Sequence, residues 1–216
     1  MRIGLLGTGH VAQALAAGWA RAGHDIVLGS RRPEDADLLT ELKELLDAGV
    51  RVGTSSGAAA HAEVLVNATP GTASMAVLES IGAAALEGKV LLDVAVGFLE
   101  DKSLSHPVVS LGEEIQQAFP ATPVVKTFST IDRVVMVDPG SLSGPATIFL
   151  SGDDADAKRT VSGLLADLGW SEESVLDLGG IETARGQEHF ALLFVGIARA
   201  IDSFAFGIRV VPPATA

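Results

Sequence analysis

The sequence predicts an α/β fold in which a mostly parallel, doubly wound sheet carries helices on both faces. The first half of the chain alternates short apolar segments with alanine- and leucine-rich helical segments, and continuous apolar strands are typical of a parallel sheet covered on both sides. A glycine-rich turn joins the first apolar segment to the first helical one. Hydrophobic residues make up 48% of the 216 residues, enough for a sizeable core. We therefore expect a Rossmann-like fold with a C-terminal α/β extension.

Short apolar runs bounded by turn residues predict the strands of the first half. These strands span residues 2–6, 25–28, 50–53, 64–68, 89–96 and 124–128. Four helices are expected between them, each from helical spacing of apolar residues or from a capping residue. They are residues 11–22, closed by Gly23; a leucine-rich helix from Pro33 to Gly49; a brief helix capped by Ser55 or Ser56; and residues 73–85.

The second half begins with a loop rich in turn residues, over residues 129–145. A strand at residues 147–150, a helix at 153–168, a strand at 175–178 and a long apolar helix from about Glu182 to Phe206 are expected to follow. No repeat or low-complexity linker separates the two halves. We therefore expect residues 129–216 to be an extension packed on the same body as residues 1–128.

Composition excludes several classes of function. The formal net charge is −12, so the chain offers no basic field to attract a nucleic acid or an anionic membrane. Cysteine is absent, which excludes disulfides, thiolate metal sites and a cysteine nucleophile. The five histidines show no metal-ligand spacing, and the longest apolar run, residues 190–208, is interrupted by Arg199 and Asp202. We expect a soluble cytoplasmic protein with no metal site, no nucleic-acid partner and no membrane partner.

The turn after the first strand carries the pattern G-x-G-x-x-A, in "GTGHVA" at residues 7–12. Gly7 permits a tight turn, Gly9 lets the backbone approach a pyrophosphate, and Ala12 lets the helix pack close to the strand. The helix that follows offers free amide groups and a positive dipole end to phosphates. The position between a strand and a helix favours dinucleotide binding over a plain structural turn.

Two arginines follow the second strand, in "VLGSRRPE". The end of this strand lies beside the adenine ribose in Rossmann folds, and NAD enzymes usually carry an acidic residue there. Here Ser30, Arg31 and Arg32 occupy that position. Guanidinium groups bind a 2′-phosphate through charge-assisted hydrogen bonds, so we expect NADP rather than NAD, and residues 1–128 as the NADP-binding core. The alternative is that both arginines are solvated surface charges.

These two motifs and several later segments resemble a known family. The later segments are "NATP", "VVKTFST", "SGDDADAKRTVSGLLADLGW" and "DLGGIETARGQEHF". Together they are similar to the NADP oxidoreductases that depend on coenzyme F420, a deazaflavin, over nearly the whole chain. The resemblance makes a deazaflavin or a flavin the candidate second substrate. It also implies NADPH contacts at Thr8, Gly9, His10 and Val11 around the pyrophosphate, at Ser30, Arg31 and Arg32 around the 2′-phosphate, and at Thr69 and Pro70 towards the nicotinamide.

Three further segments occupy the carboxyl ends of strands, where ligands bind in open α/β sheets: residues 67–70, 93–97 and 126–130. Asn67 or Thr69 is expected either to bond the cofactor or to cap a strand end. Small residues are expected to leave room for a flat ring system at the nicotinamide. They are Ala68, Gly71, Ala95 and Gly97.

Catalytic side chains are not assigned from the sequence. Lys126 is expected to face solvent or to pair with an acid, with catalysis as the weaker alternative, and Asp93 to be a polar group at the sheet edge. Polar residues after the strand at 124–128 either bond a substrate carbonyl or form a turn. They are Thr127, Ser129 and Thr130. Glu188 and His189 on the last helix are expected to be structural, although a substrate cleft is within reach.

The function expected from these residues is hydride transfer between NADP(H) and a flat redox acceptor, a deazaflavin or flavin. Few acid–base candidates are needed because the cofactors carry the chemistry. The alternatives are reduction of an imine or a small 3-hydroxy acid, or a non-catalytic NADP-sensing module. Apolar residues around most of the last helix predict a homodimer, with a helix buried wholly inside one chain as the alternative. They are Phe190, Leu193, Phe194, Ile197, Ile201, Phe204 and Phe206.

Overall fold

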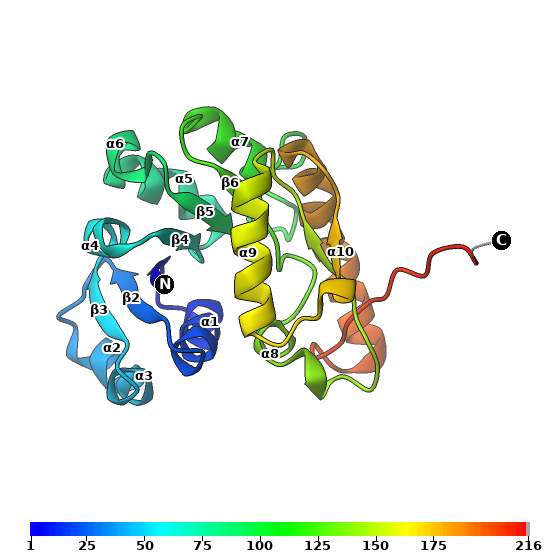
Figure 1. Cartoon of the computed structure of the whole chain (residues 1–216), viewed down its shortest axis with the longest axis horizontal. Coiled ribbons are helices and arrows are strands. Elements are labelled where there is room, and N and C mark those ends of the chain that lie inside the picture. Colours follow the sequence, from blue (N-terminus) through cyan, green and yellow to red (C-terminus); the bar gives the residue numbers. More distant parts are fainter. Residues whose placement is uncertain (215–216) are drawn as a thin grey trace.

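The computed structural model describes residues 1–214 and confirms the predicted fold class (Figure 1). Six parallel strands form one sheet in the order β3-β2-β1-β4-β5-β6. They are β1 (Arg2–Leu6), β2 (Asp25–Ser30), β3 (Arg51–Thr54), β4 (Val64–Asn67), β5 (Val90–Asp93) and β6 (Val124–Lys126). Strand β1 lies between β2 and β4, so the winding reverses there. Ligands bind at the carboxyl edge of such a reversal point.

Helices cover both faces of this sheet. They are α1 (His10–Arg21), α2 (Ala36–Glu41), α3 (Lys43–Asp47), α4 (Ser55–His61), α5 (Gly71–Ile81), α6 (Ala83–Leu86) and α7 (Leu111–Ala118) in the first half. Alternate strand residues point to opposite faces, which divides the core into two clusters. Ile3 and Leu5 pack with residues of α1, whereas Leu6 and Leu65 pack with residues of α4 to α7.

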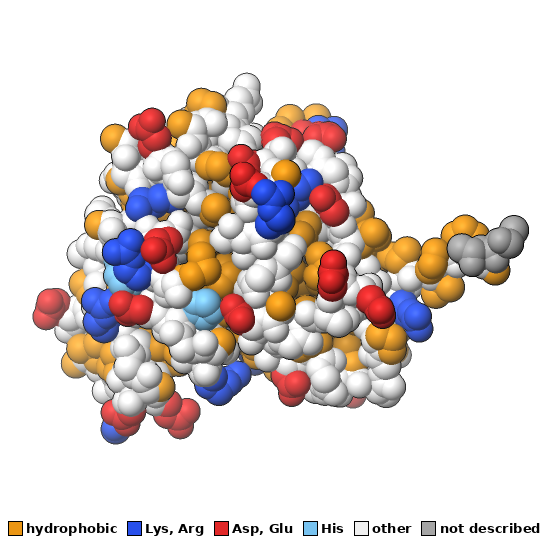
Figure 2. All heavy atoms as spheres, viewed as in Figure 1, with side chains coloured by type: hydrophobic (Ala, Val, Ile, Leu, Met, Phe, Trp, Pro, Cys, Tyr) orange, Lys and Arg blue, Asp and Glu red, His pale blue; other side chains and the backbone are white. Residues whose placement is uncertain are grey.

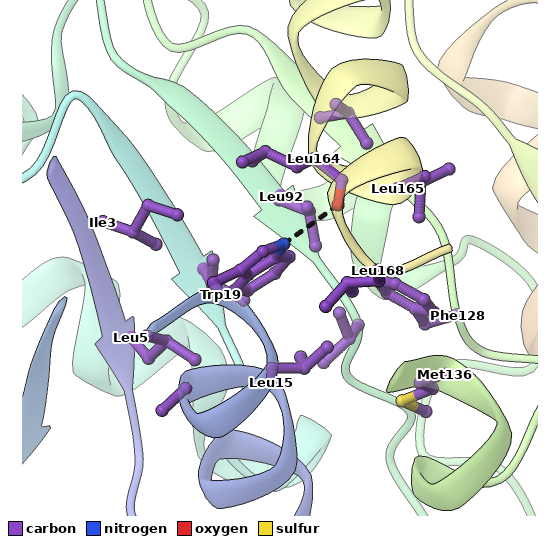
Figure 3. Packing of buried hydrophobic residues seen from close by; sticks show 14 of the residues in the cluster. Ile3, Leu5, Leu15, Trp19, Leu92, Phe128, Met136, Leu164, Leu165 and Leu168 are labelled. Atoms are coloured by element: carbon purple, nitrogen blue, oxygen red, sulfur yellow. Dashed lines mark hydrogen bonds between the residues drawn. The ribbon is translucent and has the colours of Figure 1, made fainter. Parts of the chain in front are cut away.

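The C-terminal part adds a two-stranded parallel sheet and three helices. They are β7 (Ile148–Leu150), β8 (Val175–Asp177), α8 (Arg133–Val137), α9 (Ala155–Asp167) and α10 (Ala184–Ile201), with single 3-10 turns at Pro139–Ser141, Glu172–Ser174 and Ile181–Thr183. Helix α9 packs against α1, where the indole nitrogen of Trp19 donates to the carbonyl of Leu164 at 3.0 Å (Figure 3). Backbone hydrogen bonds between Lys126 and Ser151, at 2.8 and 3.1 Å, join the C-terminal part to β6. The division at residue 128 stays a prediction.

Several expected elements are shorter or divided. The helix expected at residues 73–85 is α5 and α6, separated by Gly82, whose φ of +89° ends α5. The leucine-rich helix begins beyond Pro33, after Asp35, whose carboxylate accepts from two amide groups of the first turn, and it is divided at Leu42. Thr54, rather than Ser55 or Ser56, caps α4.

The strands expected at residues 89–96 and 124–128 also end early. Phe128 has a φ of 63°, a left-handed conformation that β structure cannot contain, and it turns the chain after β6. The last helix ends at Ile201 rather than Phe206, because Asp202 is left-handed with a φ of 52°. Helices α7 and α8 were not expected. The spacing of Ser110 and Glu113, which form a capping box at the start of α7, was a sequence signal for α7.

Candidate cofactor-binding cleft

A cleft of about 980 Å³ lies at the carboxyl ends of β1, β2, β4 and β5. All twelve residues predicted to bind the cofactor line it. They are Gly7, Thr8, Gly9, His10, Val11, Ser30, Arg31, Arg32, Ala68, Thr69, Pro70 and Ala95. The structure thus brings together residues from four separate segments of the sequence. Their role in binding stays a prediction, because a shared cleft does not identify its ligand.

The β1–α1 loop has the geometry that a phosphate site needs. Gly7 has a φ of +109°, and a Cβ there would lie 2.8 Å from the carbonyl of Ala68, so only glycine fits. Gly9 differs, because a Cβ there would meet nothing within 4 Å among the described residues and would stand in open space. Helix α1 begins at His10 without an acidic residue in its first turn. Its amide groups and dipole are therefore available to an anion.

The arginine segment lies at the end of β2. Ser30 is almost buried, and its Oγ accepts from the backbone amide of Arg32 at 3.0 Å, which leaves its hydroxyl hydrogen free to donate. Arg31 and Arg32 are both exposed. The guanidinium of Arg32 lies 3.2 Å from the carboxylate of Asp35, with 83% of the Arg32 side chain exposed. Such a surface pair contributes only about 0–1 kcal/mol, so Arg32 remains available to a phosphate.

The predicted nicotinamide end lies at β4 and β5. The Asn67 side chain is buried, donates to Asp93 at 2.8 Å and accepts from the Thr69 hydroxyl at 2.6 Å. Of its two expected roles, Asn67 therefore takes that of a polar cap at a strand end. Thr69 lines the cleft itself.

Gly71 and Gly97 are small for a different reason from the one expected. A Cβ on Gly71 would overlap the backbone of Gly97, so the two backbones pack directly on each other. Neither glycine is among the described residues that line the cleft. Ala68 and Ala95 do line it, and they leave the space at this end of the cleft.

A buried ion cluster lies directly behind Ala95. The ammonium of Lys126 lies 2.8 Å from carboxylate oxygens of both Asp93 and Glu188, and it also donates to the carbonyl of Ala95. Lys126 and Asp93 have no exposed side-chain surface and Glu188 has 2%. Burial alone would lower the pKa of Lys126, but the two carboxylates outweigh it, and the pKa lies above its usual value. Lys126 therefore pairs with acids, which was one of its two expected arrangements. The other expectation, that it faces solvent, was wrong.

The other polar candidates are not among the described residues that line the cleft. Thr127 and Thr130 are buried, and the Ser129 hydroxyl donates back to the carbonyl of Thr127 at 3.4 Å. Glu188 accepts from the amides of Leu111 and Gly112 at the start of α7, at 3.0 and 3.1 Å. The imidazole of His189 lies 3.1 Å from the carbonyl of Pro107. These contacts support the structural role expected for both residues of the last helix.

The far wall of the cleft is formed by the C-terminal part, and the sequence patterns did not predict it. It is formed by Ile131, Asp132, Arg133 and Met136 near α8 and by Phe194 of α10. Phe194 is held by Phe206, which stacks on it at 4.7 Å between ring centroids. Residues 131–133 follow a left-handed turn at Phe128, and no local pattern in the sequence indicated that turn.

Neither a membrane span nor a metal cluster was found in the described part of the chain. Within residues 1–214, no helix is long and apolar enough to cross a bilayer. No group of three or more histidine, aspartate or glutamate side chains within that range could hold a metal ion.

The strand order and the glycine-rich loop define a Rossmann-type protein of the dinucleotide-binding class. The family model for "NADP oxidoreductase coenzyme F420-dependent" matches residues 2–97. The F420-dependent NADP reductase of Methanothermobacter marburgensis is 30% identical over 214 residues, covering 91% of this chain and 92% of that protein. The chain therefore belongs to the coenzyme F420-dependent NADP oxidoreductase family, which confirms the resemblance seen in its motifs.

Other known proteins are also similar. The metalloreductase STEAP3 of Rattus norvegicus is 30% identical over 212 residues, which cover 97% of this chain but only 40% of the rat protein. A crystal structure from Arthrobacter sp. FB24, of a proposed F420-dependent NADP-reductase, has a TM-score of 0.90 at 37% identity and covers 98% of this chain and 100% of that one. A reductive aminase from Aspergillus terreus, in complex with NADPH, has a TM-score of 0.68 at 18% identity, covers 93% of this chain and 62% of that one, and shares the fold alone.

Proposed function

We propose that this protein binds NADPH in the cleft and transfers its hydride to a flat redox acceptor, a deazaflavin or flavin. The observation that carries the proposal is the placement of Ser30, Arg31 and Arg32 in one cleft with the open loop at Gly9. This arrangement suits a dinucleotide with a 2′-phosphate, because guanidinium groups replace the carboxylate that NAD enzymes use at that position. Family membership supports the use of NADP(H).

Different residues of the cleft bind different parts of NADPH. The amides at the start of α1 bind the pyrophosphate, and the arginine segment binds the 2′-phosphate. Thr69, Pro70 and Ala95 bound the space for the nicotinamide, and Phe194 and Met136 supply an apolar wall that excludes water. When bound, NADPH supplies the hydride. The chain must then hold donor and acceptor in a reactive geometry, which requires shape more than a proton donor.

Acceptor identity is tested by following NADPH oxidation at 340 nm against a panel of acceptors. Coenzyme F420 and flavins are expected to be reduced, whereas quinones, cyclic imines and ferric chelates are expected to be poor acceptors. Turnover of an imine or of a small 3-hydroxy acid without F420 or flavin turnover would favour the alternative reductase. Tight NADPH binding without turnover of any acceptor would favour a non-catalytic NADP-sensing module.

We also propose a homodimer through the last helix. Several large apolar side chains on and after α10 are more than two-fifths exposed: Leu192, Leu193, Ile201 and Phe204. Figure 2 shows apolar side chains continuing along the C-terminal segment that stands off the body, where Val211 is 77% exposed. Light scattering at micromolar concentration is expected to give the mass of two chains, and a monomer would contradict the proposal.

Two further expectations are kept as proposals. Residues 1–128 form the NADP-binding core and residues 129–216 an extension on the same body, so heat is expected to unfold both in one transition. The net charge of −12 supports a cytoplasmic protein without nucleic-acid or membrane partners. Cell fractionation that recovers the protein with membranes or nucleic acid would contradict this.

A further inference from the structure

Among the described residues, the hydrogen bonds of the buried ion cluster lead to the cleft through Asp93 and Lys126. Asp93 accepts from three groups: the ammonium of Lys126 at 2.8 Å, the amide side chain of Asn67 at 2.8 Å and the backbone amide of Ala95 at 3.2 Å. Through Asn67 the hydrogen bonds continue to the hydroxyl of Thr69. The ammonium of Lys126 donates directly to the carbonyl of Ala95. Two cleft-lining residues, Thr69 and Ala95, are thus held from behind by one buried network.

The other side of the cluster faces the body of the protein. Glu188, on α10, accepts from Lys126 and from the two amides at the start of α7. These contacts fasten α10 to α7. Asp93 and Glu188 therefore pair with the same ammonium at the same distance, but Asp93 accepts from Asn67 and Ala95 beside the cleft, whereas Glu188 accepts from Leu111 and Gly112, which are not among the described residues that line it.

The adenine half of the cleft is held by different contacts. The amide of Gly7 donates to the carbonyl of Gly29 at 3.0 Å, and the side chain of Gln13 donates to the carbonyl of Thr8 at 2.9 Å. The turn at Arg32 is closed by Ser30. The two ends of the cleft are therefore supported independently.

We propose that Asp93 and Lys126 are positioning residues for the nicotinamide half of NADPH, acting through Ala95, Asn67 and Thr69, and that they have no part in binding the adenine half. This inference rests on the proposed function. The physical basis is that a fully buried, fully hydrogen-bonded charge permits few alternative arrangements of the groups bonded to it. Such support keeps a site in its productive geometry. A misplacement of about 1 Å can lower a reaction rate by about a hundredfold.

The test compares Asp93→Asn with Glu188→Gln. Each substitution neutralises one carboxylate of the same cluster and leaves Lys126 paired with the other. Both variants are titrated with NADPH, followed by the fluorescence of the reduced nicotinamide, and with adenosine 2′,5′-diphosphate, which lacks the nicotinamide half, followed by calorimetry. The variant Leu86→Ala, in the buried core at α6, controls for lost stability alone.

Asp93→Asn is expected to weaken NADPH by at least about tenfold, or about 1.4 kcal/mol, and adenosine 2′,5′-diphosphate by less than about twofold. It is also expected to change the emission spectrum of bound NADPH. Glu188→Gln and Leu86→Ala are expected to leave both affinities within about twofold of the wild type. A purely structural role would not separate the two ligands.

An equal loss for both ligands in Asp93→Asn, no loss for either, or the same selective loss in Glu188→Gln would overturn the positioning role. If Asp93→Asn does not fold, Asn67→Ala replaces it, because that change cuts the link to Thr69 without altering a charge. The same selective loss is then expected, and its absence overturns the proposal. A wild-type protein that binds neither ligand would contradict the proposed function itself, which distinguishes the two failures.

Discussion

Removal of the Lys126 ammonium is expected to cause a large, pH-dependent loss of stability. In Lys126→Met the side chain keeps a similar length, but the buried carboxylates of Asp93 and Glu188 lose the cation that lies 2.8 Å from each. Removing one partner of a buried ion pair costs about 3–5 kcal/mol, because the remaining charge is uncompensated. For a chain of this size, 1 kcal/mol corresponds to roughly 2–4 °C in Tm. We therefore expect Tm to fall by roughly 6–20 °C at neutral pH.

The stability that the Lys126 ammonium contributes depends on pH. In the wild type, the raised pKa of Lys126 means that its contribution is complete below the unfolded value of about 10.4 and is lost only as pH rises through the higher folded value. The stability that Lys126 contributes to the wild type is therefore constant between pH 5 and about 9. The deficit of Lys126→Met should thus be constant between pH 5 and 8 and should shrink only as the pH rises towards the folded pKa of Lys126.

Urea unfolding followed by circular dichroism at pH 5, 6.5 and 8 measures this deficit. The triple variant Asp93→Asn, Lys126→Met, Glu188→Gln carries no buried charge in the cluster and serves as the control. Its stability relative to the wild type should show little change between pH 5 and 8. A Lys126→Met deficit below about 1 kcal/mol, or one that grows as the pH falls, would refute the reasoning about the cluster.

Two further predictions concern single glycines. Gly9→Val is expected to abolish NADPH binding in a calorimetric titration, while Tm stays within a few degrees of the wild type. The reason is that the space at this position is open to a ligand rather than filled by protein. An unfolded variant or an unchanged affinity for NADPH would contradict the placement of the loop. Gly71→Ala is expected to lower the free energy of unfolding, measured by urea denaturation, by about 1–3 kcal/mol, because the added Cβ overlaps the backbone of Gly97. A variant as stable as the wild type would show that the two segments separate easily.

Sequence patterns predicted the sheet and the first part of the cleft because both depend on local signals. Apolar runs predict the strands, and the spacing of Gly7 and Gly9 predicts a tight turn whose backbone can approach a pyrophosphate. The arginines could be interpreted because the Rossmann fold fixes where the second strand ends. All of these residues lie in the cleft.

What the sequence could not show depends on contacts between distant segments. Lys126 meets Glu188, 62 positions along the chain, and no local pattern distinguishes a buried lysine of this kind from an exposed one. The residues of the far wall near α8 follow a left-handed turn at Phe128, a conformation that bulky residues rarely adopt. Gly71 and Gly97 were interpreted as space for a ligand, although a Cβ on Gly71 would overlap the backbone of Gly97 and a Cβ on Gly97 would overlap the side chain of Ser105.

The most direct test of the account is the ratio of the dissociation constants of NADPH and NADH, measured at physiological salt for the wild type and for the double variant Arg31→Ala, Arg32→Ala. If both guanidinium groups bond the 2′-phosphate, each contact contributes about 1.5–3 kcal/mol, and the double variant should bind NADPH roughly two to four orders of magnitude more weakly. NADH lacks that phosphate, so its affinity should change little, and the long-range effect of the lost charges should be nearly equal for the two nucleotides. A wild type without a preference for NADPH, or a double variant that keeps a preference of the same size, would show that the arginines are surface charges and would contradict the assignment of this cleft to NADP.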